Sequence, residues 1–144
     1  MKVEIKTVLS ESEEGAEIRV VSVTDEIKSA VDLLENNRRN IPVIDEERTV
    51  LCPLELVYYI ESVDKQTFVY TKSKCFRSKQ RLYELEGVLP YEFFRCSKSM
   101  IVNTKKIASV KAEFNARFRA TMLNGEEVII SRNYVKDLKG KLGL

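Results

Sequence analysis

The stretch "FFRCSKSMIVNTKKI", residues 93–107, decides how the larger part of this chain is interpreted. Two aromatic residues lead directly into a cationic, hydroxyl-rich segment at residues 95–99, and a short apolar run then ends at Asn103 and two lysines. This pattern indicates a polar elbow held between hydrophobic anchors. Lysine and arginine neutralise phosphates, and serine hydroxyls donate to the same oxygens. We therefore interpret the elbow as a candidate contact with a polyanion.

Strand patterns surround this elbow on both sides. Short apolar and alternating runs predict strands at residues 41–44, 49–52, 56–61, 67–71, 74–77, 107–112, 117–123 and 127–130. The last two flank Asn124-Gly125, a dipeptide that favours the positive φ angles of a type I′ hairpin. The predicted fold class is therefore mainly β.

Two short helices are predicted within this β region. The first is indicated by a capping Ser78, leucines at positions 82, 85 and 89, and Pro90 beyond its end. The second is indicated by a start near Ser131, inward-facing Val135, Leu138 and Leu142, and outward-facing Lys136, Lys139 and Lys141. Both apolar stripes are interpreted as core packing.

The N-terminal part, residues 1–45, has the pattern of a small β-β-α unit. Its apolar positions are Val3, Ile5, Val8 and Leu9 for one strand, Ile18, Val20, Val21 and Val23 for a second, and Ile27, Ala30, Val31 and Leu34 for a helix face. Thr24 is the predicted helix cap, and Asn36 and Asn37 are predicted to end the helix. A unit of this size must pack on the second predicted domain, residues 46–144, or on a second copy.

Length and charge bound the class of protein. The chain has 144 residues, 44% apolar and 32% charged, which is typical of a folded protein, and no run reaches the ~18 apolar residues of a membrane helix. Its acidic start differs from a signal peptide, so we expect a cytoplasmic location. Residues 1–48 contain 7 Lys and Arg against 12 Asp and Glu, net −5, and residues 49–144 contain 17 against 10, net +7. The basic part suits a polyanion, with a chance division of solvated faces as the alternative.

Several kinds of chemistry are excluded by composition. Histidine is absent, which removes the usual general base and the commonest metal ligand. The three cysteines, Cys52, Cys75 and Cys96, contain no closely spaced pair, which argues against a zinc site and a disulfide framework. No glycine-rich phosphate loop is present. We therefore expect no enzyme, no catalytic residue, no metal, no cofactor and no small-molecule substrate.

Nucleic acid is the favoured partner because basic residues recur at turns and element ends. Gln66, Lys98, Arg132 and Asn133 carry the donors that read base edges in a major groove. RNA binding by a stacking platform would need exposed aromatic side chains among the basic residues. The aromatic residues here lie among apolar neighbours and are interpreted mostly as core, so double-stranded DNA is preferred.

From about residue 49 to residue 144 the chain resembles the LytTR (LytR/AlgR-type) DNA-binding domain. The resemblance is carried by LELVYYIES, RLYELEGVLP, FFRCSKSMIVNTKKI and LNGEEVIISRNYVKDL, and by their spacing. It implies a fold of short β-sheets with one small helix and a C-terminal helical turn, whose loops enter successive major grooves. The base-reading positions that it implies are Gln66, Thr67, Lys98, Arg132 and Asn133, and the phosphate contacts are Ser99, Ser131 and Lys136.

The resemblance also carries expectations about partners and regulation. Residues 1–45 are similar to the N-terminal region of stand-alone regulators that lack a receiver domain, which implies a homodimer and suggests a membrane-bound inhibitor protein. Cys96 is interpreted as a small buried hydrophobe, and the alternative is a redox role in which an oxidised sulfur displaces the reading loop. Some family members are redox-sensitive, but their partner cysteine matches Val128 here, which argues against a disulfide. Asn133 stands where members often carry a second basic residue. The alternative function from another class is a protein-interaction adaptor that binds no nucleic acid.

Overall fold

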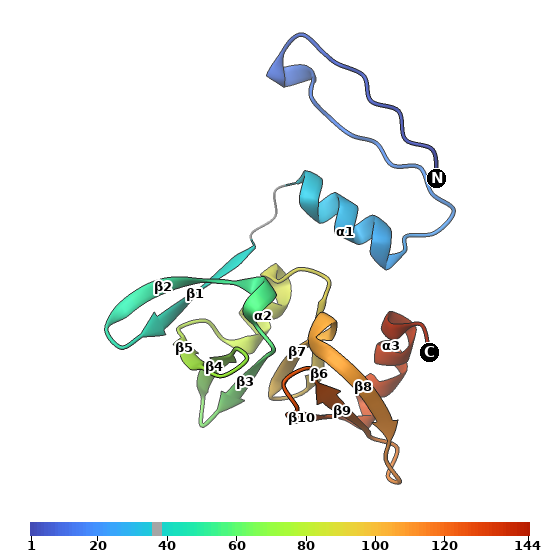
Figure 1. The fold of residues 1–144 in the computed structure, drawn as a ribbon. Helices are drawn as coiled ribbons and strands as arrows, with labels where there is room; N and C mark the ends of the chain where they lie inside the picture. Colours follow the sequence, from blue (N-terminus) through green and yellow to red (C-terminus); the bar gives the residue numbers. More distant parts are fainter. Residues whose placement is uncertain (36–38) are drawn as a thin grey trace.

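The computed structural model describes residues 1–35 and 39–144, which form ten strands and three α-helices (Figure 1). A seven-stranded antiparallel sheet has the strand order β2-β1-β5-β4-β3-β7-β6. Its strands are β1 (Asn40–Asp45), β2 (Arg48–Pro53), β3 (Tyr59–Val63), β4 (Gln66–Tyr70), β5 (Cys75–Ser78), β6 (Phe93–Ser97) and β7 (Met100–Asn103). A second sheet, in the order β10-β9-β8, contains β8 (Ile107–Ala112), β9 (Phe118–Met122) and β10 (Glu127–Ile130). The predicted mainly β fold is confirmed.

The helices lie in three different places along the chain. Helix α1 (Asp25–Leu34) precedes the sheets, α2 (Leu82–Val88) connects β5 to β6, and α3 (Arg132–Leu142) follows β10 (Figure 1). Thr24 caps α1 by accepting the Ile27 N–H at 3.3 Å, as predicted. None of these helices has the length and apolar character that crossing a membrane requires, within the described part of the chain.

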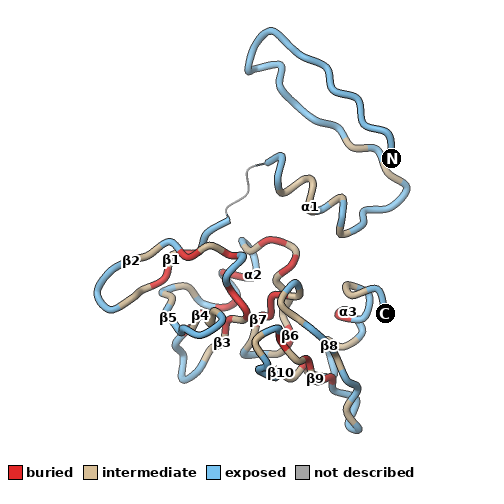
Figure 2. Tube along the Cα trace, viewed as in Figure 1, coloured by how far each residue is buried: buried red, intermediate tan, exposed pale blue. Residues whose placement is uncertain are grey.

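Two hydrophobic clusters hold the sheets and helices together. The first packs α2 against the larger sheet and contains Ile41, Val43, Cys52, Leu54, Val57, Ile60, Val69, Leu82, Leu85 and Ile101. The second joins β6 and β7 to the smaller sheet and α3, and contains Tyr58, Cys96, Val102, Phe118, Ala120, Met122, Val128, Ile130 and Leu138. Figure 2 shows these buried positions along the strands, whereas residues 1–24 are largely exposed. Burial of apolar side chains in clusters of this kind is the main favourable contribution to folding.

A buried amide joins β7 to the start of β3. The Asn103 side chain is 2% exposed; its Nδ2 donates to the Val57 carbonyl at 2.8 Å, and its Oδ1 accepts the Lys105 N–H at 3.1 Å. The Asn103 backbone N–H donates to the Tyr58 carbonyl at 2.9 Å. These bonds satisfy polar groups in a region without access to water, where an unpaired group would be costly.

Most predicted strands are confirmed, with two additions and one shift. The segments at 41–44, 49–52, 67–71, 74–77, 107–112, 117–123 and 127–130 correspond to β1, β2, β4, β5, β8, β9 and β10. The run at 56–61 begins too early, because Leu54–Leu56 forms a 3₁₀ turn. The elbow at 93–103 is a complete hairpin, β6 and β7, which the patterns do not predict because its strands are short and β6 contains a bulge between Arg95 and Ser97.

Two turns differ from the prediction. The hairpin around Asn124-Gly125 is present, but only Gly125 has a positive φ, of 87°, so it is not a type I′ turn. There the Gly125 N–H donates to the Met122 carbonyl at 2.9 Å, and Asn124 Oδ1 accepts the Glu126 N–H at 3.1 Å. The two-residue turn with consecutive positive φ angles lies instead at Asp64 and Lys65, with values of 50° and 64°, between β3 and β4.

Helix α2 starts later than predicted, because Ser78 belongs to β5 and is not its cap. The Ser78 Oγ accepts the Gln80 N–H at 3.1 Å, while the Glu84 carboxylate accepts the Arg81 N–H at 3.1 Å at the true helix start. Helix α3 follows Ser131 and buries Leu138, as predicted.

The two strands predicted within residues 1–24 are not formed. This segment contains only a 3₁₀ turn at Glu11–Glu13 and leaves Val3, Ile5 and Leu9 exposed. An isolated pair of strands has no third strand or covering helix to bury one face, which explains why apolar alternation alone does not produce a hairpin here. The predicted helix end at Asn36 and Asn37 lies outside the described residues. The predicted boundary at residue 45 separates β1 from β2, whereas β1 pairs along its whole length with β2 in the larger sheet.

Candidate nucleic-acid interface

The β3–β4 turn provides the first predicted contact segment. Asp64, Lys65 and Gln66 are all exposed at its tip. Thr67 was predicted beside Gln66 as a base-reading residue, but its side chain is 4% exposed because neighbouring residues of a strand point to opposite faces. The structure thus leaves Gln66 on the surface and places Thr67 beneath it.

The β6–β7 turn provides the second segment, with Lys98 and Ser99 exposed. Arg95 organises this turn from below: its Nε donates to the Ser97 carbonyl at 2.7 Å, and a terminal nitrogen donates to the Lys98 carbonyl. The other terminal nitrogen pairs with Glu86 of α2 at 2.9 Å. All the guanidinium contacts therefore face the protein, so Arg95 positions the turn. The sequence patterns group Arg95 with the basic residues and do not reveal this role.

The start of α3 provides the third segment. Arg132 and Asn133 occupy its first turn, Lys136 follows one turn later, and all three are exposed. Ser131, which precedes the helix, is half-buried, and its backbone N–H donates to the Cys96 carbonyl of β6 at 2.8 Å. The Phe94 and Tyr134 rings meet edge to face at 6.4 Å between centroids, which fixes the helix against β6.

The three segments meet at one edge of the molecule, here called the binding edge and defined as residues 64–66, 97–99, 131–133 and 136. Strands β3 and β7 are antiparallel neighbours, and the Ser62 N–H donates to the Ser99 carbonyl at 2.8 Å. The bond from Ser131 to Cys96 then attaches α3 beside the same turn. Because Cys96 immediately precedes residue 97, each segment is linked to its neighbour through the protein backbone.

The binding edge carries positive charge that the protein does not neutralise. Lys65, Lys98, Arg132 and Lys136 are exposed and form no ion pair within residues 1–35 and 39–144. Free cations on a rigid β scaffold are suited to neutralising phosphates. The arrangement can therefore bind a polyanion without first breaking internal salt bridges.

One predicted basic pair lies elsewhere. Lys105 and Lys106 follow β7, whose opposite end leads to the β6–β7 turn, so they cannot share the binding edge. The Lys106 Nζ lies 5.4 Å from the centre of the Tyr58 ring, and the Lys105 Nζ lies 5.6 Å from that of Tyr91. Both lysines therefore make cation–π contacts on a different part of the surface.

Cys96 is buried, as the small-hydrophobe interpretation requires. Its side chain is 0% exposed in the cluster that also contains Val128, and burial raises the pKa of its thiol to about 12. The Sγ donates weakly to the Met100 carbonyl at 3.6 Å, next to the β6–β7 turn. A thiol that stays protonated and lacks solvent contact is a poor nucleophile.

The aromatic residues of the β3, β4 and β6 strands do not form a stacking platform, and the exposed Tyr83 and Phe114 lie in α2 and after β8. Tyr58 is buried, while Phe93 and Phe94 are half-buried and pack on the clusters. Tyr59 stacks on Tyr70 at 4.5 Å between ring centroids, and its hydroxyl donates to Glu126 at 2.8 Å. These rings are occupied by contacts within the protein, which does not favour RNA binding through stacked bases.

Comparisons with known proteins agree with this geometry. The family profile of the LytTr DNA-binding domain matches residues 47–143. A LytTr DNA-binding domain from Bacillus cereus superimposes with a TM-score of 0.71 at 29% sequence identity, covering 75% of this chain and 100% of that domain.

Relatives also match by sequence over most of this chain. An uncharacterized HTH-type transcriptional regulator of Staphylococcus aureus (strain NCTC 8325 / PS 47) is 29% identical over 147 residues, covering 100% of this chain and 99% of that protein. The sensory transduction protein LytT of Enterococcus faecalis is 31% identical over 105 residues, covering 72% of this chain and 43% of that protein. In the described part of this chain, strands separate each helix from the next, so its α-helices do not form a helix-turn-helix unit.

Proposed function

This chain belongs to the family of LytTr DNA-binding domains and is a DNA-binding transcription regulator, and we propose that it reads its operator through the three segments of the binding edge. The observation that supports this proposal is the pair of backbone hydrogen bonds, Ser62 to Ser99 and Ser131 to Cys96, that hold the segments together. A protein-interaction adaptor without nucleic-acid binding is not favoured by the family match.

The roles of the individual residues follow from their chemistry. Gln66 and Asn133 present amides that pair with adenine N6 and N7, while Lys98 and Arg132 present donors for guanine O6 and N7. Ser99, Ser131 and Lys136 complete the edge as phosphate contacts. Thr67 is omitted from the readers because its side chain is buried. The proposal includes a cytoplasmic location, since a regulator acts where the chromosome lies.

The proposal is tested by selecting binding sites from a random DNA pool with the full chain. We expect an enriched sequence whose affinity exceeds that of random duplex by at least about 1000-fold. The affinity should also fall with salt, with a slope of about −0.9 per neutralised phosphate in a log–log plot. Equal affinity for selected and random duplex, or an affinity that ignores salt, would exclude this function.

Replacing Arg95 by alanine is expected to weaken operator binding about tenfold, because the Ser97 and Lys98 carbonyls lose the donors that hold the turn. The salt slope should stay unchanged, because Arg95 positions the turn and contacts no phosphate. Operator titrations at several salt concentrations measure both quantities.

Glu86→Gln is the matched control for Arg95, because the amide oxygen still accepts from the guanidinium while the ion pair is lost. Its operator affinity should change by less than about twofold, since an exposed ion pair contributes little. If the salt slope of Arg95→Ala decreased by about one, Arg95 would instead contact a phosphate of the DNA.

The proposal extends to a homodimer formed through the N-terminal part. An apolar trough between α1 and residues 1–24, here called the arm, is lined by Ile18, Val20, Ile27, Val31 and Leu34, and Leu33 of α1 is also exposed. A monomer rarely exposes contiguous apolar surface of this kind. The N-terminal part contacts the remainder sparsely; one such contact is a hydrogen bond between the Ser29 and Tyr91 hydroxyls. A second copy would cover the surface that the chain itself leaves open.

Deleting residues 1–23, which leaves the Thr24 cap of α1 in place, is expected to convert the dimer to a monomer and to weaken binding to a two-site operator at least tenfold, because cooperativity is lost. The melting temperature of the remaining chain should change little, since the deleted side chains are largely exposed. Sedimentation and thermal unfolding measure the two effects. An unchanged dimer would refute this role, and would favour docking of a regulatory protein, such as the membrane-bound inhibitor that the resemblance suggests.

A further inference from the structure

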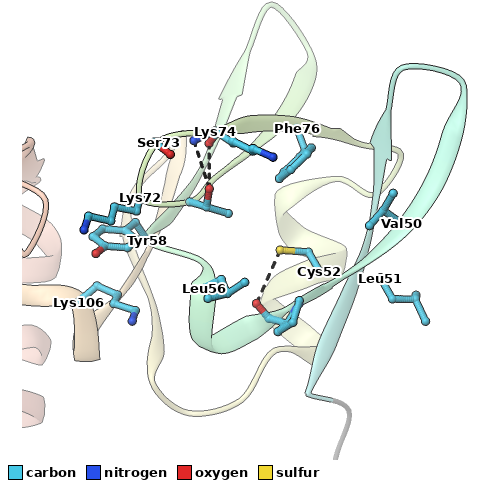
Figure 3. A pocket seen from close by; sticks show the side chains of 12 residues that line it. Val50, Leu51, Cys52, Leu56, Tyr58, Lys72, Ser73, Lys74, Phe76 and Lys106 are labelled. Atoms are coloured by element: carbon cyan, nitrogen blue, oxygen red, sulfur yellow. Dashed lines mark hydrogen bonds between the residues drawn. The ribbon is translucent and has the colours of Figure 1, made fainter.

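An apolar groove lies away from the binding edge, between the edge hairpin β1–β2 and the β4–β5 turn. Its volume is about 530 Å³, within the range of roughly 300–1,000 Å³ that is typical of small-molecule sites. The residues that line it include Val50, Leu51, Leu56, Tyr58 and Phe76. Figure 3 shows Val50 and Leu51 on one side of the groove, Tyr58 on the other, and Leu56 between them.

The apolar groups of this groove are open to solvent, although the protein has a well-packed core. Leu51 is 60% exposed and Leu56 is 51% exposed. Leu51 lies in β2, which is an edge strand of the larger sheet, so no neighbouring strand covers it. An exposed apolar surface of this size that is also concave is typical of a binding site.

The charges of the groove are all of one sign. Lys72, Lys74 and Lys106 line it, and no lining residue carries a carboxylate. None of the three lysines forms an ion pair with any described residue. Figure 3 shows Lys72 and Lys106 on either side of the Tyr58 ring, with Lys74 beside Phe76. The groove therefore combines an apolar floor with cations at its rim.

These cations are not available to a duplex on the binding edge. The β4–β5 turn lies at the end of β4 opposite Gln66, and Lys106 follows the end of β7 opposite the β6–β7 turn. The length of the strands separates the two groups of basic residues. The positive charge of the groove is thus available to a ligand other than the operator.

We propose that this groove binds an amphipathic carboxylate, a small molecule with an aliphatic chain of about eight to twelve carbons and one anionic head. The chain would cover Leu51, Leu56 and Phe76, and the head would lie beside Tyr58, where Lys72 and Lys106 flank the ring and can donate to it. The backbone on the Tyr58 side also contacts the β9–β10 turn: the Lys72 carbonyl accepts from Asn124 Nδ2 at 3.1 Å, and the Lys106 carbonyl accepts the Leu123 N–H at 2.8 Å. A bound ligand therefore sits at the junction of the two sheets.

The experiment titrates the full chain with decanoate, decanol and acetate, each below its aggregation concentration, and follows backbone amide shifts by NMR. We expect decanoate to shift the amides of residues 50–58 and 71–76, decanol to bind several-fold more weakly, and acetate to leave them unchanged. Three results would each overturn the proposal. They are an affinity for decanol equal to that for decanoate, no shifts in these residues, and shifts centred on the apolar trough at Ile18 and Val31.

Variants separate the charge from the apolar surface. Lys72→Gln with Lys106→Gln should weaken decanoate binding roughly three- to tenfold without changing decanol binding, because the two cations that flank Tyr58 are lost. The control, Lys28→Gln with Lys111→Gln, removes two exposed lysines that do not line the groove and should leave both affinities unchanged. Thermal unfolding checks that both variants remain folded. A synthetic peptide of residues 1–24 that displaced decanoate would assign the groove to the chain's own arm and refute the small-molecule ligand.

Discussion

Replacing both Lys98 and Arg132 by alanine is expected to lower the preference for the selected operator over random duplex by about 100- to 1,000-fold. Each residue is a candidate partner for guanine, and a bidentate contact to a base contributes about 1–3 kcal/mol of discrimination. Both side chains are exposed on the binding edge and have no ion pair among the described residues, so their removal should not unfold the domain. Competition titrations with operator and random duplex measure the ratio.

Two controls separate base reading from general electrostatics. Lys136→Ala should weaken binding to all sequences about equally and reduce the salt slope by about one, as expected for a phosphate contact. The double variant Lys72→Ala and Lys105→Ala removes the same amount of charge as the test variant. Both lysines follow the ends of β4 and β7 that point away from the binding edge, so the preference for the operator over random duplex should stay unchanged. A test variant that retained the full preference for the operator would remove these residues from base recognition.

Replacing Asn103 by aspartate is expected to lower the free energy of unfolding at pH 7 by about 3–5 kcal/mol. The amide Nδ2 donates to the buried Val57 carbonyl at 2.8 Å, and a carboxylate would place an oxygen against that oxygen. The site is 2% exposed, so water cannot solvate the new charge. Chemical denaturation of the variant and the parent chain measures the difference.

The same substitution has a predictable pH dependence. Burial raises the pKa of the new carboxyl in the folded state above its unfolded value, so the destabilisation should be smaller at pH 4 than at pH 8. Asn115→Asp is the matched control: residue 115 is exposed, its Oδ1 accepts from Arg117 at 3.1 Å, and a carboxylate keeps that role. Similar unfolding free energies for the two variants would show that the Asn103 amide is dispensable.

The contrast between two alternating segments shows what periodicity can predict. Ile41 and Val43 alternate in the same way as Val3 and Ile5, and both pairs indicate a strand. The first pair is buried because β1 pairs with β2 and β5 and faces the first cluster. The second pair finds neither a neighbouring strand nor a covering helix and remains exposed. Alternation of apolar and polar residues indicates that one face of a segment is suited to burial. A strand forms only if a neighbouring strand also pairs with that segment.

The site residues divide in a similar way. The exposure of Lys98 and Arg132 was predictable, because a turn and a helix start both present long cationic side chains to solvent. The burial of Thr67 was not predicted because Gln66 and Thr67 were treated as one loop, although the strand period places them on opposite faces. The part played by Arg95 was hidden because its two acceptors are backbone carbonyls, which no residue pattern reveals.

The sequence by itself determined the local features of this protein: the strand periodicities, the Thr24 cap, the inward face of α3 and the kinds of donor that each surface segment carries. These depend on residues within a few positions of one another. Only the tertiary structure decided which basic segments share an edge, since this depends on the pairing of β3 with β7 and on the docking of Ser131 against Cys96. Contacts between residues more than thirty positions apart place the segments of Gln66, Lys98 and Arg132 at one edge. Lys105 and Lys106 lie at the other end of β7, because strand order sets the end of the sheet at which each turn emerges.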